Sequence, residues 1–99
     1  MTDFRNRKVL ITGAASGIGR LLALRIAARG GRLILWDMDA AHLAAAAAEI
    51  VAAGGQAVVV ACNLAERESI EAAAARTLAE QGAIDVLINN AGIVDGKPL

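Results

Sequence analysis

Four short apolar runs alternate with three longer segments of helical periodicity, and this alternation constrains the fold more than any other feature of the sequence. The apolar runs cover residues 9–11, 33–36, 57–61 and 86–88. They are short and rich in Val, Ile and Leu, as strands buried on both faces of a sheet are. Because strand–helix–strand crossovers are right-handed, the order predicts an α/β fold: a doubly wound parallel sheet with strand order 3-2-1-4 and helices on both faces.

The three intervening segments carry apolar residues at spacings of three and four, the period of an amphipathic helix. The first two helices are predicted on one face of the sheet and the third, residues 66–81, on the other. Asp39 is the expected N-cap of the second helix, and glycines at 30–31, 54–55 and 82 are the expected stops. The predicted buried stripes are Ile18, Leu21, Leu22 and Ile26; Leu43, Ala47 and Ile50; and Ile70, Ala73, Ala74, Thr77 and Leu78.

The composition excludes several classes of binding site and indicates how many domains to expect. The 99 residues show no linker or repeat, so residues 1–99 are expected to form a single domain. Ten basic and ten acidic residues balance, so the sequence has no excess of positive charge of the kind that binds nucleic acid or an anionic membrane. The single cysteine, Cys62, is expected to be a buried thiol, and it excludes an internal disulfide and a Cys-cluster metal site. With no apolar run of bilayer length, we expect a soluble, cytoplasmic protein without metal.

A glycine-rich loop joins the first strand to the first helix. Residues 12–19 read T-G-A-A-S-G-I-G. Gly13 permits a tight turn, Gly17 lets the main chain approach a phosphate, and Gly19 lets the helix lie close to the sheet. The N–H groups at the start of the helix can then receive a pyrophosphate. The alternative is a turn without a ligand. A Walker loop is excluded, because no Gly-Lys-Ser/Thr follows.

Asp37 ends the second strand at the same edge of the sheet. At this position a carboxylate can accept hydrogen bonds from an adenosine ribose, and its charge would repel a 2′-phosphate. A plain helix-start aspartate is the alternative, although Asp39 suits that role better. His42 is expected to be a solvated helix residue with no acid or nucleophile near it.

Taken with Asn63-Leu64 and Asn89-Asn90-Ala91-Gly92, the loop and Asp37 resemble the N-terminal half of a short-chain dehydrogenase/reductase with a T-G-x-x-x-G-x-G loop and a Rossmann-type fold. The resemblance implies NAD rather than NADP, since no basic residue stands at 15, 16 or 38. At Asn63 many relatives have Asp at the adenine edge, and Asn offers both a donor and an acceptor there. The cofactor-binding residues that it implies are Gly13, Ser16, Gly17, Ile18, Gly19, Asp37, Asn63, Leu64, Asn90, Ala91 and Gly92.

The family's catalytic Tyr and Lys have no counterpart here, because the sequence contains no tyrosine. The resemblance therefore implies no catalytic residue in this chain. We expect a truncated cofactor-binding part, inactive alone, of an NAD-dependent oxidoreductase acting on a small-molecule alcohol or ketone. The alternative is a free-standing, non-catalytic dinucleotide-binding or assembly module. Strand 86–88 is expected at the edge of the sheet, where it would favour a homo-oligomer.

Overall fold

The computed structural model describes residues 3–91, 93–94 and 97–98. Its main feature is a parallel sheet in the order β3-β2-β1-β4, which confirms the predicted order. In β1, Ile11 lies between Leu35 of β2 and Ile88 of β4. The elements of this layer structure are β1 (Lys8–Thr12), α1 (Gly17–Ala28), β2 (Arg32–Asp37), α2 (Ala40–Ala52), β3 (Gln56–Ala61), α3 (Arg67–Gln81) and β4 (Val86–Asn89).

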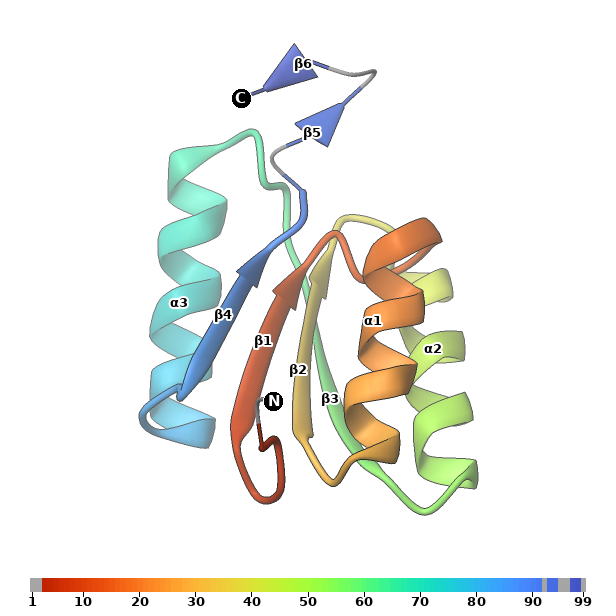
Figure 1. Cartoon of the computed structure of the whole chain (residues 1–99). Coiled ribbons are helices and arrows are strands. Elements are labelled where there is room, and N and C mark those ends of the chain that lie inside the picture. The colour runs from red at the N-terminus through yellow and green to blue at the C-terminus, as the bar shows by residue number, and fades with distance from the viewer. Residues whose placement is uncertain (1–2, 92, 95–96, 99) are drawn as a thin grey trace.

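The helices cover the two faces unequally, as predicted. Figure 1 shows α1 and α2 side by side on one face and α3 alone on the other. Because side chains alternate along a strand, β1 contributes residues to the cores on both faces of the sheet. Val9 and Ile11 join the core beneath α1 and α2, and Leu10 joins the smaller core beneath α3, which also contains Trp36 and Ala73.

The buried stripe of α1 differs from the predicted one. Ile18 is 70% exposed and Leu21 is 50% exposed, whereas Gly19, Ala23 and Ile26 are buried. Small residues allow the helix backbone to approach the sheet, so the face that packs is the one that carries Gly and Ala rather than the one with the largest side chains. The prediction for Ile18 and Leu21 was therefore wrong.

Smaller corrections apply to α2 and α3. In α2 Ala46 is buried and Ala47 only half-buried. In α3 Leu78 is 60% exposed, whereas Thr77 next to it is buried as predicted. The Thr77 hydroxyl accepts a hydrogen bond from Trp36 Nε1 at 3.2 Å, which satisfies the one polar atom of the indole.

The end of the described chain contains a short antiparallel pair, β5 (Ile93–Val94) and β6 (Lys97–Pro98). The sequence predicted no element after β4, because strands of two residues are too short to produce a periodic pattern. No helix in the described ranges is long and apolar enough to cross a membrane.

Candidate functional site

The polar residues singled out in the sequence meet at the carboxyl edge of the sheet. Gly13 follows β1, Asp37 ends β2, Asn63 follows β3, and Asn90 follows β4. The four strands of the parallel sheet all run toward this edge (Figure 1). A hollow of about 520 Å³ opens there, within the range of small-molecule sites. Its lining residues are Gly13, Asp37, Met38, Asn63, Leu64, Ala65 and Ala91.

The glycine-rich loop is anchored at its start and open at its apex. The N–H groups of Gly13 and Ala14 both donate to the Trp36 carbonyl, at 2.8 and 3.2 Å. Ala14 and Ala15 are buried, whereas Ser16 and Gly17 are exposed. Gly17 begins α1 with a left-handed φ of 59°, and a Cβ added there would meet no atom within 4 Å. The start of α1 is therefore exposed, and the first N–H groups of a helix have no acceptor within the helix, as an anion-binding helix start requires.

Gly19 makes the close contact that its sequence position predicts. A Cβ at this residue would overlap the Gly13 carbonyl and come within 2.7 Å of Asn90 Nδ2. The Asn90 amide in turn donates to the Gly13 carbonyl at 3.2 Å. The start of α1 is thus packed directly against the ends of β1 and β4.

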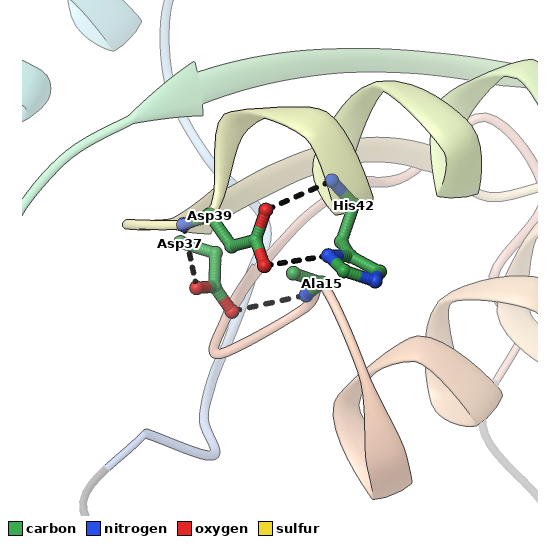
Figure 2. A network of polar contacts seen from close by, with 4 residues as sticks. All are labelled: Ala15, Asp37, Asp39 and His42. Atoms are coloured by element: carbon green, nitrogen blue, oxygen red, sulfur yellow. Dashed lines mark hydrogen bonds and ion pairs between the residues drawn. The ribbon is translucent and has the colours of Figure 1, made fainter.

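Asp37 connects the glycine-rich loop to the start of α2. Its Oδ2 accepts from the Ala15 N–H at 3.0 Å and its Oδ1 accepts from the Asp39 N–H at 3.1 Å (Figure 2). The side chain is half-buried and lines the hollow. Because each carboxylate oxygen can accept more than one hydrogen bond, the group keeps acceptor capacity for a ligand.

Asn63 is held within its own loop. Its Oδ1 accepts from the Ala65 N–H and its Nδ2 donates to Glu66, both at 2.9 Å. Its backbone N–H donates to the Ser69 hydroxyl at 2.8 Å. One amide hydrogen and one lone pair remain for a ligand at the hollow, fewer than a free side chain would offer.

Thr12 is a contributor that the sequence analysis did not single out. Its hydroxyl donates to Asn89 Oδ1 at 3.0 Å and accepts from the Ala91 N–H at 3.1 Å, so it fixes the segment after β4. The threonine that precedes the first glycine was the available signal. Gly92, also predicted for the site, lies outside the described residues.

The surroundings of His42 differ from the prediction. The side chain is exposed, as expected, but an acid is close: its Nδ1 lies 2.5 Å from Asp39 Oδ2 (Figure 2). Asp39 is the predicted N-cap of α2, and its Oδ1 accepts from the His42 N–H at 3.0 Å. The capping turn itself brings the imidazole back to the carboxylate, so the expectation of no nearby acid was wrong.

Cys62 is a buried free thiol, which confirms that prediction. Desolvation and, secondarily, the charge of Asp37 raise its pKa, so the neutral thiol is favoured. Within the part of the chain that the structure describes, no three His, Cys, Asp or Glu side chains are grouped to hold a metal ion.

Comparison with known proteins finds one protein family, and the matches cover nearly the whole chain. A family model described as short chain dehydrogenase matches residues 7–99. The 1,6-dihydroxycyclohexa-2,4-diene-1-carboxylate dehydrogenase of Acinetobacter baylyi is 47% identical over 89 residues, which cover 90% of this chain and 34% of that protein. The chain spans 15% to 38% of the length of the first curated relatives that it matches.

Two solved structures with bound cofactors share the fold. A metagenomic short-chain oxidoreductase in complex with NADP matches with a TM-score of 0.86 and 40% identity, over 93% of this chain and 42% of that one. A short chain dehydrogenase/reductase from Burkholderia phymatum in complex with NAD matches with a TM-score of 0.85 and 34% identity, over 94% and 33%.

Proposed function

The chain belongs to the short-chain dehydrogenase family, and we propose that it forms the cofactor-binding part of an NAD-dependent oxidoreductase that acts on an alcohol or ketone. The observation that carries the proposal is that Gly13 of the glycine-rich loop, Asp37 and Asn63 line one hollow at the carboxyl edge. Ligands of doubly wound sheets bind at this edge. A dinucleotide that bound here would supply the nicotinamide that accepts or donates the hydride.

Each group at the site has a task in holding the cofactor. The open N–H groups at the start of α1, where Gly17 and Ile18 are exposed, would bind the pyrophosphate. Asp37 would accept from the adenosine ribose hydroxyls. Asn63 and Leu64, which line the same hollow, would contact the adenine. Asn90 and Ala91 would lie along the riboses, and Ser16 and Gly19 would form the rest of the phosphate-binding loop.

We propose NAD as the preferred cofactor, because Asp37, the side chain proposed to bind the adenosine ribose, is an acid. The 2′-phosphate of NADP would meet the Asp37 carboxylate, and neither Ala15, Ser16 nor Met38 offers a cation. The two cofactor-bound structures differ on this point, one holding NADP and the other NAD. The preference therefore depends on Asp37.

Asp37→Ala tests the assignment. Removing the carboxylate loses the ribose hydrogen bonds and the repulsion of the phosphate, so the preference for NAD over NADP should fall about tenfold to a hundredfold. The measurement is calorimetric titration of both cofactors into the natural protein that carries these residues. Glu80→Ala is the matched control: it removes an exposed acid from the last turn of α3, at the opposite edge of the sheet, and should leave both affinities unchanged. Equal or tighter binding of NADP by the unsubstituted protein would refute the role of Asp37.

Hydride transfer is a property that we propose for the whole protein, not for residues 1–99 alone. The chain contains no tyrosine to give or take the hydroxyl proton. We therefore propose that the 99-residue polypeptide reduces no ketone and oxidises no alcohol. Appearance of reduced nicotinamide in the whole protein with NAD and an alcohol, followed by absorbance, separates this reading from a non-catalytic binding module.

A further inference from the structure

The total charge of the sequence is balanced, but the charges are unevenly distributed along the chain. Residues 4–36 contain seven basic residues and no acid, whereas residues 37–85 contain eight acids and two basic residues. The first of these ranges contributes β1, α1 and β2. A charge asymmetry of this kind within one chain indicates a surface of one sign, which bears on partner binding rather than on the fold.

The fold gathers five of these basic residues at the amino edge of the sheet, where the strands begin. The segment before β1 runs along the turn after α1. The Asn6 N–H donates to the Gly30 carbonyl at 3.0 Å, and a Cβ at Gly30 would come within 3.3 Å of Arg5 Cα. The Arg32 N–H donates to the Arg7 carbonyl at 2.8 Å. We call these exposed arginines the basic surface: Arg5, Arg7, Arg25, Arg29 and Arg32.

The end of α1 adjoins the same segment. Phe4, Arg25 and Arg29 line one hollow, so the two arginines of α1 lie beside the residues that precede β1. Figure 1 shows this segment and the end of α1 at the edge opposite the one toward which the strands run. A ligand on the basic surface therefore leaves the proposed dinucleotide site at Asp37 open.

The acids that adjoin the basic surface offset only part of its charge. Asp3 forms an exposed ion pair with Arg5 at 3.2 Å, and Asp85 accepts from the Lys8 N–H at 2.8 Å. With Lys8 included, six cations and two acids leave a formal excess of four positive charges. Within the described ranges, no acid forms an ion pair with the following three arginines: Arg7, Arg25 and Arg32.

A role in stabilising α1 accounts for only two of these arginines. Cations near the C-terminus of a helix interact favourably with its dipole. Arg25 lies in the last turn of α1 and Arg29 is its C-cap residue. Arg7 precedes β1 and Arg32 begins β2, so neither is part of a helix. Helix stabilisation therefore does not explain why they lie beside the end of α1.

We infer that the basic surface binds an acidic polypeptide segment, whose carboxylates pair with the arginines. A guanidinium group is a planar fork of N–H donors that can make two parallel hydrogen bonds to one carboxylate. The inference goes beyond the proposed function, because it concerns the opposite edge of the sheet and needs no dinucleotide.

Two other classes of anionic partner fit the basic surface less well. Proteins that bind single-stranded nucleic acid stack bases on aromatic side chains, but Phe4 is half-buried and Trp36 is buried. Proteins that lie on anionic membranes place apolar side chains among the headgroups. The exposed large apolar residues of the described chain all fall outside residues 4–7 and 25–32: Ile18, Leu21, Met38, Val51, Val58, Leu78 and Leu87.

The test is calorimetric titration of short poly-L-glutamate into the natural protein that carries these residues, at about 50 mM and about 200 mM salt. Arg7→Gln and Arg25→Gln each remove one charge from the basic surface. Arg67→Gln is the matched control, because it removes the same charge from an exposed arginine at the start of α3, at the carboxyl edge. Thermal melts check that the three variants fold.

We expect poly-L-glutamate to bind at the lower salt concentration and to bind more weakly at the higher one, because salt screens exposed charges. Arg7→Gln and Arg25→Gln should each raise the dissociation constant about twofold to fivefold, the effect of losing one exposed ion pair. Arg67→Gln should leave it unchanged. Saturating NAD should also leave it unchanged, since the two sites lie at opposite edges.

Three results would overturn the inference. The first is no binding of poly-L-glutamate at the lower salt concentration. The second is an equal loss of affinity in Arg67→Gln, which would show that only the total charge matters. The third is equal or tighter binding of a DNA duplex or of vesicles containing phosphatidylglycerol, which would assign the basic surface to another class of polyanion. If the protein binds poly-L-glutamate as expected but no NAD, the proposed function fails and this inference stands.

Discussion

Gly17 and Gly54 are matched glycines that differ in their distance from the proposed site. Both have left-handed φ angles, 59° and 92°, and a Cβ at either would meet no atom within 4 Å. Gly17 opens α1 at the carboxyl edge of the sheet, whereas Gly54 follows α2 at the other edge. A substitution at either residue causes the same kind of backbone strain, about 1–2 kcal/mol. A difference between the two variants in cofactor binding therefore measures the effect of the substitution on the proposed site, and not an effect of backbone strain.

We predict that Gly17→Val abolishes dinucleotide binding while Gly54→Val preserves it, because only the first places methyl groups where a phosphate must approach. Their melting temperatures should fall by similar amounts. Gly19→Val should destabilise the fold far more than either, since its side chain would overlap the Gly13 carbonyl. Calorimetric titration with NAD and thermal melts of the three variants check this. Normal binding by Gly17→Val would show that the loop is only a turn.

The residues of the site were predictable to the extent that their roles depend on backbone position. Gly13 follows β1, Gly17 begins α1 and Asp37 ends β2, and the order of strands and helices places them at one edge. The hydroxyl of Thr12 and the contact between His42 and Asp39 were missed, because they depend on side-chain orientation in the folded chain. Asn63 shows the same limit: the sequence identifies the amide, but only the structure shows that its loop already uses it.

At the scale of elements, strands were easier to predict than helix faces. A run such as 33–36 is apolar on both sides, so its assignment does not depend on which side faces a helix. The buried face of α1 was predicted correctly at Ile26 but not at Ile18 and Leu21, because pattern analysis counts large apolar residues as core and undervalues Gly19 and Ala23. Close approach of a helix to a sheet is a tertiary requirement that hydrophobic periodicity does not express.

At the scale of the whole molecule, β4 is an edge strand of the four-stranded sheet and pairs there with β1 alone among the described residues. A hollow of about 490 Å³, lined in part by Phe4, Leu22 and Ile88, lies on one of its faces. Another of about 470 Å³, lined in part by Leu10, Trp36 and Leu87, lies on the other. Leu87 is 65% exposed. An unpaired strand edge with apolar surface on both faces favours association.

We predict that the 99-residue polypeptide by itself self-associates or melts without cooperativity, and that Leu87→Asp reduces the association. Val51→Asp is the control, because Val51 is 57% exposed on α2, away from β4. Sedimentation velocity gives the size distribution, and circular dichroism gives the melt. A monodisperse monomer with a cooperative transition would contradict the prediction and would favour a free-standing binding module.

The central claim, that a dinucleotide binds at the carboxyl edge, is tested most directly by hydrogen–deuterium exchange of the natural protein with and without saturating NAD. The account predicts slower exchange in peptides covering residues 12–20, 36–40, 62–66 and 89–91, which surround the hollow. It predicts no change in the connections at the opposite edge, residues 30–32, 53–56 and 82–85, and loss of the protection in Gly17→Val. Protection confined to the opposite edge, or unchanged exchange around the hollow at saturating NAD, would contradict it.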